Sequence, residues 1–305
     1  MAAEAARFKD LRLRLASALI LLAVVIGSLV VGAGAFTALC LLLALLASWE
    51  WIGLTDPPDR YAPRWRFRGD VAALALVSGI GPLLVLAVGM EAIQAGGAPW
   101  QALLWAWVAA TLFFMARRRL GLGHHLTDAS DRLASHSLVT SSGLVMIWGA
   151  TVIIIALRGV PDHGLGLVLM LFFTVWATDS GAYLFGRAIG GPRLWPQVSP
   201  NKTWAGVFGG LLAGTVTGIV VSGIIVSSTV PGGSGEAVHA LISPWVVIIL
   251  SLATQFGDLG ESALKRLYGA KDAGDLIPGH GGALDRIDGL ILAAWVLAIL
   301  SALYV

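Results

Sequence analysis

Charged residues are scarce in this sequence, and their scarcity excludes most classes of soluble protein. Only 12% of the 305 residues are charged, whereas 57% are apolar. An ordinary soluble domain has about 25% charged residues, because a water-facing surface needs that charge. The composition therefore excludes a secreted soluble domain, a disordered chain and a nucleic-acid binder. It indicates a chain whose main solvent is lipid.

Cysteine is almost absent as well. The single cysteine, Cys40, lies within an apolar run of the sequence. One cysteine cannot form a disulfide within the chain, and it cannot supply the ligands of a cysteine-based zinc site. The sequence therefore has neither a disulfide framework nor a zinc site of that kind.

Long apolar runs, in contrast, fill most of the chain. A helix needs about 20 largely apolar residues to cross the hydrocarbon core of a bilayer. Glycines at positions 32 and 34 separate the first two runs and predict a tight hairpin between them. We predict an all-α polytopic integral membrane protein with about nine transmembrane helices, at 15–31, 35–54, 71–90, 99–115, 138–157, 165–185, 204–226, 243–256 and 287–304.

The positions of lysine and arginine predict the orientation of these helices. With the N-terminus in the cytoplasm, nineteen of the twenty basic residues fall in cytoplasmic segments, and Arg158 alone falls outside. Cytoplasmic loops of membrane proteins carry such an excess of basic residues. The pattern predicts a cytoplasmic N-terminus and an external C-terminus. The first run could instead be a signal peptide, but it is longer than the usual core of about 7–15 residues, and another run follows at once.

Side chains that could do chemistry gather in the second half of the chain. We predict an N-terminal membrane region of about five spans over 1–164 and a C-terminal catalytic membrane region of about four spans over 165–305. The first region offers little chemistry apart from Glu50, which stands between two tryptophans. In the second region, polar residues crowd the ends of spans on one side of the membrane, at 176–203 and 255–288.

The segment 255–271 carries polar residues that a helix would place on one face. Asp258, Glu261, Ser262 and Lys265 have the spacing of neighbours on a helix surface. A helix end with internal ion pairs would explain this run by itself. The continuation favours a functional site, because residues that forbid a regular helix let backbone amides approach a phosphate. These residues are Gly274, Pro278, Gly279, Gly281 and Gly282.

Three carboxylates in this segment suggest a metal site. Asp285 and Asp288 lie where the last span begins, and Asp258 joins them from another helix. A set of oxygen ligands suits Mg²⁺ better than zinc or copper. Metal, surrounding cations and a glycine-rich loop together predict the transfer of a phosphoryl or nucleotidyl group. The cations, which suit polyphosphate oxygens, are Lys265, Arg266, Lys271 and Arg286.

The segment 176–203 forms the other polar cluster. Asp179 lies near the cytoplasmic end of the sixth span, where an unpaired carboxylate is costly and therefore indicates function. Residues 199–203, SPNKT, predict a short polar turn in which Pro200 keeps Ser199 extended, and Ser199 or Thr203 caps the seventh helix. Such a helix start attracts phosphate. A capped helix start would also explain these residues without any ligand.

Taken together, these motifs resemble the signature of the phosphatidate cytidylyltransferases, also called CDP-diacylglycerol synthases. The matching residues are SALKR at 262–266, KD at 271–272, IPGHGG at 277–282 and DRID at 285–288. SPNKT at 199–203 and DSGAY at 179–183 are also similar to that family. The resemblance extends from about residue 170 to the end. Ala283 stands where a larger aliphatic residue is usual, and Ala205 where many members carry Glu, so no carboxylate role is assigned there.

The resemblance implies a reaction and its partners. CTP would condense with phosphatidic acid from the membrane lipid bilayer to give CDP-diacylglycerol and pyrophosphate, at an active site facing the cytoplasm. The protein would lie in the inner (cytoplasmic) membrane and form a homodimer. Mg²⁺ would be held by Asp258, Asp285 and Asp288, with room for a second cation.

The same resemblance assigns roles to individual residues. The catalytic residues would be Lys202, Asp258, Lys265, Arg266, Asp285, Arg286 and Asp288. The substrate-binding residues would be Asp179, Ser199, Pro200, Asn201, Thr203, Ser262, Lys271, His280, Gly281 and Gly282. A phosphate monoester is already an anion and needs no general base, so His280 is expected to position substrate or donate a hydrogen bond.

Three other interpretations stay open. A CTP-dependent kinase acting on polyprenol or dolichol would use the same nucleotide, although the full signature argues against it. An ion-coupled transporter would also place acidic residues in broken helices, but near the middle of the membrane and with internal repeats. A structural scaffold would leave the cluster of aspartates and lysines unexplained.

Overall fold

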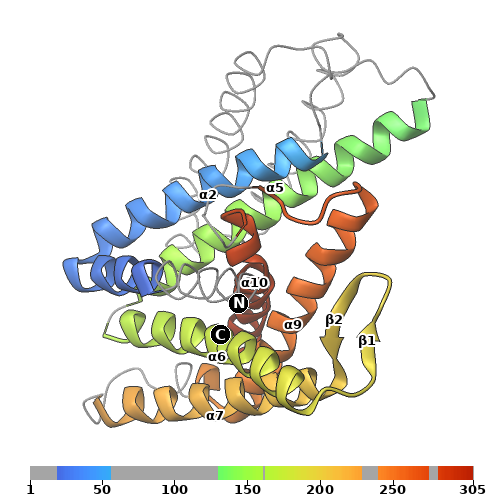
Figure 1. Cartoon of the computed structure of the whole chain (residues 1–305). Helices are drawn as coiled ribbons and strands as arrows, with labels where there is room; N and C mark the ends of the chain where they lie inside the picture. Colours follow the sequence, from blue (N-terminus) through green and yellow to red (C-terminus); the bar gives the residue numbers. More distant parts are fainter. Residues whose placement is uncertain (1–18, 56–129, 161, 229–239, 275–280, 305) are drawn as a thin grey trace, which may run out of the picture. The chain divides into compact units, whose positions relative to one another are not determined.

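The computed structural model describes residues 19–55, 130–160, 162–228, 240–274 and 281–304. These residues form α-helices, one short 3₁₀ helix and one two-stranded sheet (Figure 1). The chain divides into two compact units. One unit holds Met1–Val152 and Asp272–Arg286, and the other holds Ile153–Lys271 and Ile287–Val305. The boundary between membrane regions at residue 165 stays a prediction.

Helices also make up the described part of the first unit. The apolar helix Leu19–Val31 is followed by α2 (Ala33–Thr55). Gly32 separates them with a φ of 134°, a conformation that favours glycine. The structure therefore separates the first two runs at the first of the predicted glycines, whereas the tight hairpin between them stays a prediction. Helix α5 (Ser130–Arg158) begins in this unit, and η1 (Leu284–Arg286) completes it.

Hydrogen bonds fasten α2 to α5. The indole nitrogen of Trp51 donates to the carbonyl oxygen of Thr140 at 2.9 Å. The Thr140 hydroxyl donates to the Thr55 hydroxyl at 3.0 Å. Gly143 faces the Trp51 ring so closely that a Cβ there would collide with the indole. Both helices therefore place small or hydrogen-bonding side chains at their contact.

The described part of the second unit contains four complete helices, and its closest helix pair packs along a row of glycines. Gly206, Gly210, Gly214 and Gly218 recur at every fourth position of α7. A Cβ on Gly210 would lie 2.8 Å from the carbonyl oxygen of Thr178 in α6. Small residues allow such approach where lipid surrounds the helices. The helices of this unit are α6 (Gly164–Ile189), α7 (Trp204–Ser228), α9 (Pro244–Leu267) and α10 (Asp288–Tyr304).

A small sheet lies between α6 and α7 in the sequence. It pairs β1 (Arg193–Trp195) with β2 (Ser199–Thr203) in antiparallel orientation. Gly190 has a φ of 67° at the end of α6 and lets the chain leave the helix. The predicted polar turn over 199–203 is therefore wrong. Pro200 keeps the backbone extended, and this extended backbone pairs with β1. Because β1 has only three residues, its sequence pattern was too short to predict a strand.

The start of α7 agrees with the prediction. The amide of Gly206 donates to the Thr203 hydroxyl oxygen at 3.2 Å, so Thr203 caps this helix. Thr203 also ends β2, and the strand passes directly into the helix. The residues of β2 are therefore held at a fixed place relative to α7.

Five helices in the described part of the chain are long and apolar enough to cross a membrane: Ala33–Thr55, Leu138–Arg158, Gly164–Ile189, Trp204–Ile224 and Pro244–Leu267. The apolar helices Leu19–Val31 and Asp288–Ser301 are shorter. Each of these segments overlaps a predicted span, and Pro244–Leu267 extends beyond the predicted end at residue 256. The predicted spans at 71–90 and 99–115 lie outside the described residues. The structure confirms a mostly helical membrane protein, whereas the count of nine spans and the positions of the termini stay predictions.

Candidate active site

Helix α9 carries the predicted polar face at its C-terminal end. It continues as a single helix to Leu267, well past the apolar run predicted to end at residue 256. The Ser262 hydroxyl lies 3.5 Å from the Asp258 carboxylate, and the Lys265 ammonium lies 3.6 Å from that of Glu261. These contacts confirm that the four side chains share one face. The Lys265–Glu261 pair is also the internal ion pair that a plain helix end would have.

Lys202 reaches this face from β2. Its ammonium nitrogen lies 2.7 Å from an Asp258 carboxylate oxygen. The two side chains remain 26% and 37% exposed, respectively. The structure therefore joins the two polar segments that the sequence presented separately. An exposed pair of opposite charges can change partners, the cation binding a phosphate oxygen and the carboxylate binding a cation.

Asp288 adds a further carboxylate from the start of α10. Its carboxyl group forms a side-chain hydrogen bond with Glu261. It also interacts electrostatically with Asp258 and Lys265. The amide of Gly289 donates to an Asp288 carboxylate oxygen at 2.7 Å. Glu261, which is only 9% exposed, was not assigned to the site from the sequence. Its position on the same helical face as Asp258 could have identified Glu261 as a site residue from the sequence.

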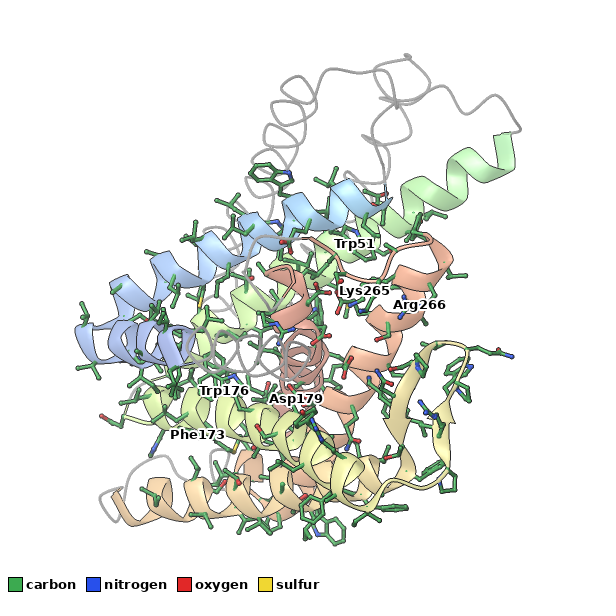
Figure 2. All side chains as sticks on the ribbon, in the orientation of Figure 1. Trp51, Phe173, Trp176, Asp179, Lys265 and Arg266 are labelled. Atoms are coloured by element: carbon green, nitrogen blue, oxygen red, sulfur yellow. The ribbon has the colours of Figure 1, made fainter. Side chains whose placement is uncertain are left out.

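Arg266 fastens the sheet to the end of α9. Its Nε donates to the carbonyl oxygen of Val198 at 3.2 Å, and an Nη donates to that of Ala270 at 3.1 Å. Figure 2 shows Arg266 and Lys265 close together near the C-terminal end of α9, and Asp179 on α6. The structure gives Arg266 a part in holding the sheet. Its contact with a triphosphate stays a prediction.

In the first unit, Asp285 binds the backbone of the glycine-rich segment. Its carboxylate accepts a hydrogen bond from Gly282 at 2.8 Å and one from Ala273, at 3.1 and 3.2 Å to its two oxygens. Gly281 has a φ of 80°, and a Cβ there would lie 2.7 Å from the Asp285 carboxylate. The amides of Ala273 and Gly282 therefore bind a carboxylate of the protein. The sequence had predicted that amides of this glycine-rich segment would approach a phosphate.

Glu50 is a second carboxylate that binds this segment, and the sequence had given it no role. One of its oxygens accepts a hydrogen bond from the amide of Ala283 at 2.9 Å. The other accepts one from the amide of Leu284 at 2.8 Å. Glu50 is the one charged residue in the sequence of α2. A lone carboxylate in an apolar helix is costly and was the signal that could have identified it.

The remaining predicted residues belong to described elements of the two units or lie outside the described residues. Ser199, Pro200 and Asn201 belong to β2, and Gly281, Gly282 and Arg286 to the part of the first unit that holds Asp285. Lys271 and Asp179 are exposed. His280 lies outside the described residues. The substrate contacts of all these residues stay predictions.

The described residues hold no group of three or more His, Cys, Asp or Glu side chains arranged to bind a metal ion. The oxygen donors of Asp258 and Asp288 nevertheless fit Mg²⁺ in their chemistry. Asp285 belongs to the other unit. Binding of one ion by all three aspartates therefore stays a prediction from the sequence.

Comparison with known proteins supports the resemblance noted in the motifs. The chain is 47% identical to the phosphatidate cytidylyltransferase of Brucella suis biovar 1 over 148 residues, which are 48% of this chain and 51% of that protein. It is 41% identical to the Staphylococcus epidermidis enzyme of the same name over 139 residues, 46% and 50% of the two chains. It is 47% identical to that of Haemophilus influenzae over 136 residues, 44% of each chain.

The alignments with single relatives cover a smaller part of the chain than the match to the family model does. The chain spans about half the length of the curated relatives it matches. The model of the cytidylyltransferase family, in contrast, matches residues 12–304. Because that match covers nearly all of the sequence, the chain belongs to the cytidylyltransferase family.

Proposed function

We propose that this chain is a membrane-embedded phosphatidate cytidylyltransferase, which forms CDP-diacylglycerol and pyrophosphate from CTP and phosphatidic acid. The observation that carries the proposal is the Lys202–Asp258 pair in a chain of this family. It joins two signature segments beside helices that are apolar enough to cross a membrane. A charged site at such a place suits a reaction between a water-soluble nucleotide and a lipid headgroup.

The reaction brings two anions together, the phosphate of the lipid and the triphosphate of CTP. A phosphate oxygen of the lipid bonds to the α-phosphorus of CTP, the bond from that phosphorus to the bridging oxygen breaks, and pyrophosphate leaves. The attacking phosphate is already an anion, so no side chain has to remove a proton. Lys202 and Lys265 supply the cations that the described part of the second unit places beside Asp258 and Glu261. Fixed cations lower the cost of aligning two anions for in-line transfer.

Mg²⁺ is the proposed cofactor, with Asp258, Asp285 and Asp288 as its ligands. A bound divalent cation neutralises charge on the reacting and departing phosphate oxygens. In the structure, the ammonium group of Lys202 forms an ion pair with one carboxylate oxygen of Asp258. We propose that Lys202 turns to the substrate phosphate when the carboxylate takes up its cation.

We also propose nine spans in the inner membrane, a cytoplasmic N-terminus, an external C-terminus and a homodimer. The distribution of nineteen of twenty basic residues to one side supports the topology. This topology would place Lys202 and Lys265 on the cytoplasmic side, where CTP is found. The resemblance to the family supports the homodimer.

A labelling experiment with the purified full chain tests the reaction and separates it from its nearest alternative. Phosphatidate, dolichol and a polyprenol are each offered with CTP carrying ³²P at either the α or the γ position, with and without Mg²⁺. We expect α-label, and no γ-label, in a lipid product made from phosphatidate and Mg²⁺. Transfer of γ-label to dolichol or polyprenol would contradict the proposal and identify a kinase.

A further inference from the structure

We propose that Glu50 is a positioning residue that fixes the backbone turn leading into Asp285. The inference rests on the proposed function, because Asp285 is one of the residues assigned to that reaction. Glu50 lies in α2, and its two partners follow it by 233 and 234 residues in the sequence. All of these residues belong to the first unit.

The carboxylate of Glu50 uses both of its oxygens on consecutive amides, Ala283 at 2.9 Å and Leu284 at 2.8 Å. Ala283 and Leu284 are only 1% and 3% exposed. Water therefore cannot readily replace the carboxylate if its side chain is removed. Two buried donors would be left without acceptors, which is more costly than the loss of an ordinary hydrogen bond.

Two glycines leave space for this carboxylate. A Cβ on Gly274 would lie 2.6 Å from one Glu50 oxygen, and a Cβ on Gly282 would lie 2.5 Å from the other. Real Cβ atoms do not approach so closely, so any larger residue would displace Glu50 or the segment. Gly274 and Gly282 thus leave room for the Glu50 carboxylate between them.

Gly282 links Glu50 to Asp285. Its amide donates to the Asp285 carboxylate at 2.8 Å, while its Cα faces Glu50. The next two amides bind Glu50 directly. Loss of Glu50 therefore frees the residues that immediately precede Asp285, and the direction of the Asp285 carboxylate changes with them.

The test combines amide hydrogen exchange with kinetics on the full-length protein. Glu50→Ala removes the acceptor, and Glu50→Gln keeps the side-chain size but replaces one acceptor oxygen by a donor. Thr55→Val is the matched control, because it removes the Thr55–Thr140 bond of the same helix without touching the segment. The measurements are exchange in peptides covering 281–286, the kcat and KM for CTP and phosphatidate, and the dependence of turnover on Mg²⁺.

We expect at least about tenfold faster exchange over 281–286 in Glu50→Ala, because charged hydrogen bonds to buried amides are lost. Exchange in α9 and α10 should stay unchanged. We also expect kcat of the folded enzyme to fall at least about tenfold, with each KM within about twofold, as for misplaced reacting groups. Glu50→Gln should fall between Glu50→Ala and the wild type, and Thr55→Val should match the wild type in exchange over 281–286 and in kcat.

A double variant sharpens the test. Gly274→Ala should disturb the wild type, because its methyl group meets the Glu50 carboxylate. In the Glu50→Ala background the same methyl group has room, so its effect on exchange and kcat should be smaller. Equal effects in both backgrounds would show that the two residues are independent.

Two outcomes would overturn the positioning role. One is unchanged exchange over 281–286 in folded Glu50→Ala protein. The other is faster exchange with unchanged kcat and Mg²⁺ dependence, which would reduce Glu50 to a purely structural residue. If the wild type makes no CDP-lipid, the proposed function fails, and the positioning role in that reaction fails with it. The exchange data would then still decide whether Glu50 holds the segment.

Discussion

Lys202 in β2 and Asp258 in α9 form an ion pair with 2.7 Å between nitrogen and oxygen, although 26% and 37% of their side chains are exposed. Exposed pairs contribute only about 0–1 kcal/mol to stability. Stability is therefore a weak reason for placing these charges together beside apolar helices. This supports the proposal that Lys202 and Asp258 bind ligands of opposite charge during the reaction.

The first prediction concerns Lys202. Lys202→Ala should lower the rate of CDP-lipid formation roughly 100-fold or more, the scale of about 2.7–4 kcal/mol for losing one transition-state contact. Thermal stability should change little, because the ion pair contributes little to it. Arg193→Ala is the control, since it removes a cation from the same sheet outside the proposed site. Near-normal turnover of Lys202→Ala would leave residues 199–203 with only a structural role.

The second prediction concerns the proposed metal ligands. Asp258→Asn and Asp285→Asn each remove one negative charge and should abolish Mg²⁺-dependent turnover. If both face one ion, the double variant should be little worse than either single variant. Asp272→Asn should be milder, because Asp272 is exposed to solvent. The measurement is turnover against Mg²⁺ concentration, with Mn²⁺ binding followed by electron paramagnetic resonance. Losses that multiply in the double variant would contradict a shared ion.

The third prediction concerns the glycine row of α7. Gly210→Leu should separate α6 from α7, because even a Cβ would lie 2.8 Å from the Thr178 carbonyl oxygen. Overpacking of this kind costs about 1–3 kcal/mol. We expect less folded protein and a lower melting temperature in detergent. Gly223→Leu is the control on the same helix, because nothing lies within 4 Å of a Cβ there. Equal stability of the two variants would argue against tight packing at Gly210.

The fourth prediction concerns topology. In a Cys40→Ala background, Gln197→Cys and Gly159→Cys each place one thiol in an exposed segment. Gln197 should lie in the cytoplasm and Gly159 outside, according to the distribution of basic residues. An impermeant thiol reagent applied to intact cells should therefore label only the cysteine at position 159. The reverse pattern would overturn the orientation and the cytoplasmic CTP site.

Local patterns in the sequence were enough to predict much of this fold. Apolar runs identified every membrane-length helix among the described residues. A helix in lipid forms its backbone hydrogen bonds within itself, so a long apolar run is enough to predict it. The polar face of α9 followed from helical spacing, and the cap at Thr203 from its place before Trp204. Each of these features depends on residues that are close together in the chain.

Features that depend on distant residues were missed. The spacing of SPNKT did not reveal β2, because its partner is a three-residue strand. The meeting of Lys202 with Asp258 joins segments that no periodicity relates. Glu50 was noticed as an isolated charge, but its partners are over 230 residues away. The row of glycines in α7 was visible in the sequence as a four-residue repeat, and we had not used it.

The long separation between Glu50 and its partners has a consequence for biogenesis. Ribosomes add about 5–20 residues per second, so roughly 10–50 s pass between synthesis of α2 and synthesis of Leu284. Throughout that interval the carboxylate must stay hydrated or take up a proton, because an unpaired charge is costly in lipid. A nascent or interrupted chain therefore displays an acidic group in an otherwise apolar helix. Those amide partners become available only when residues 283 and 284 have been made.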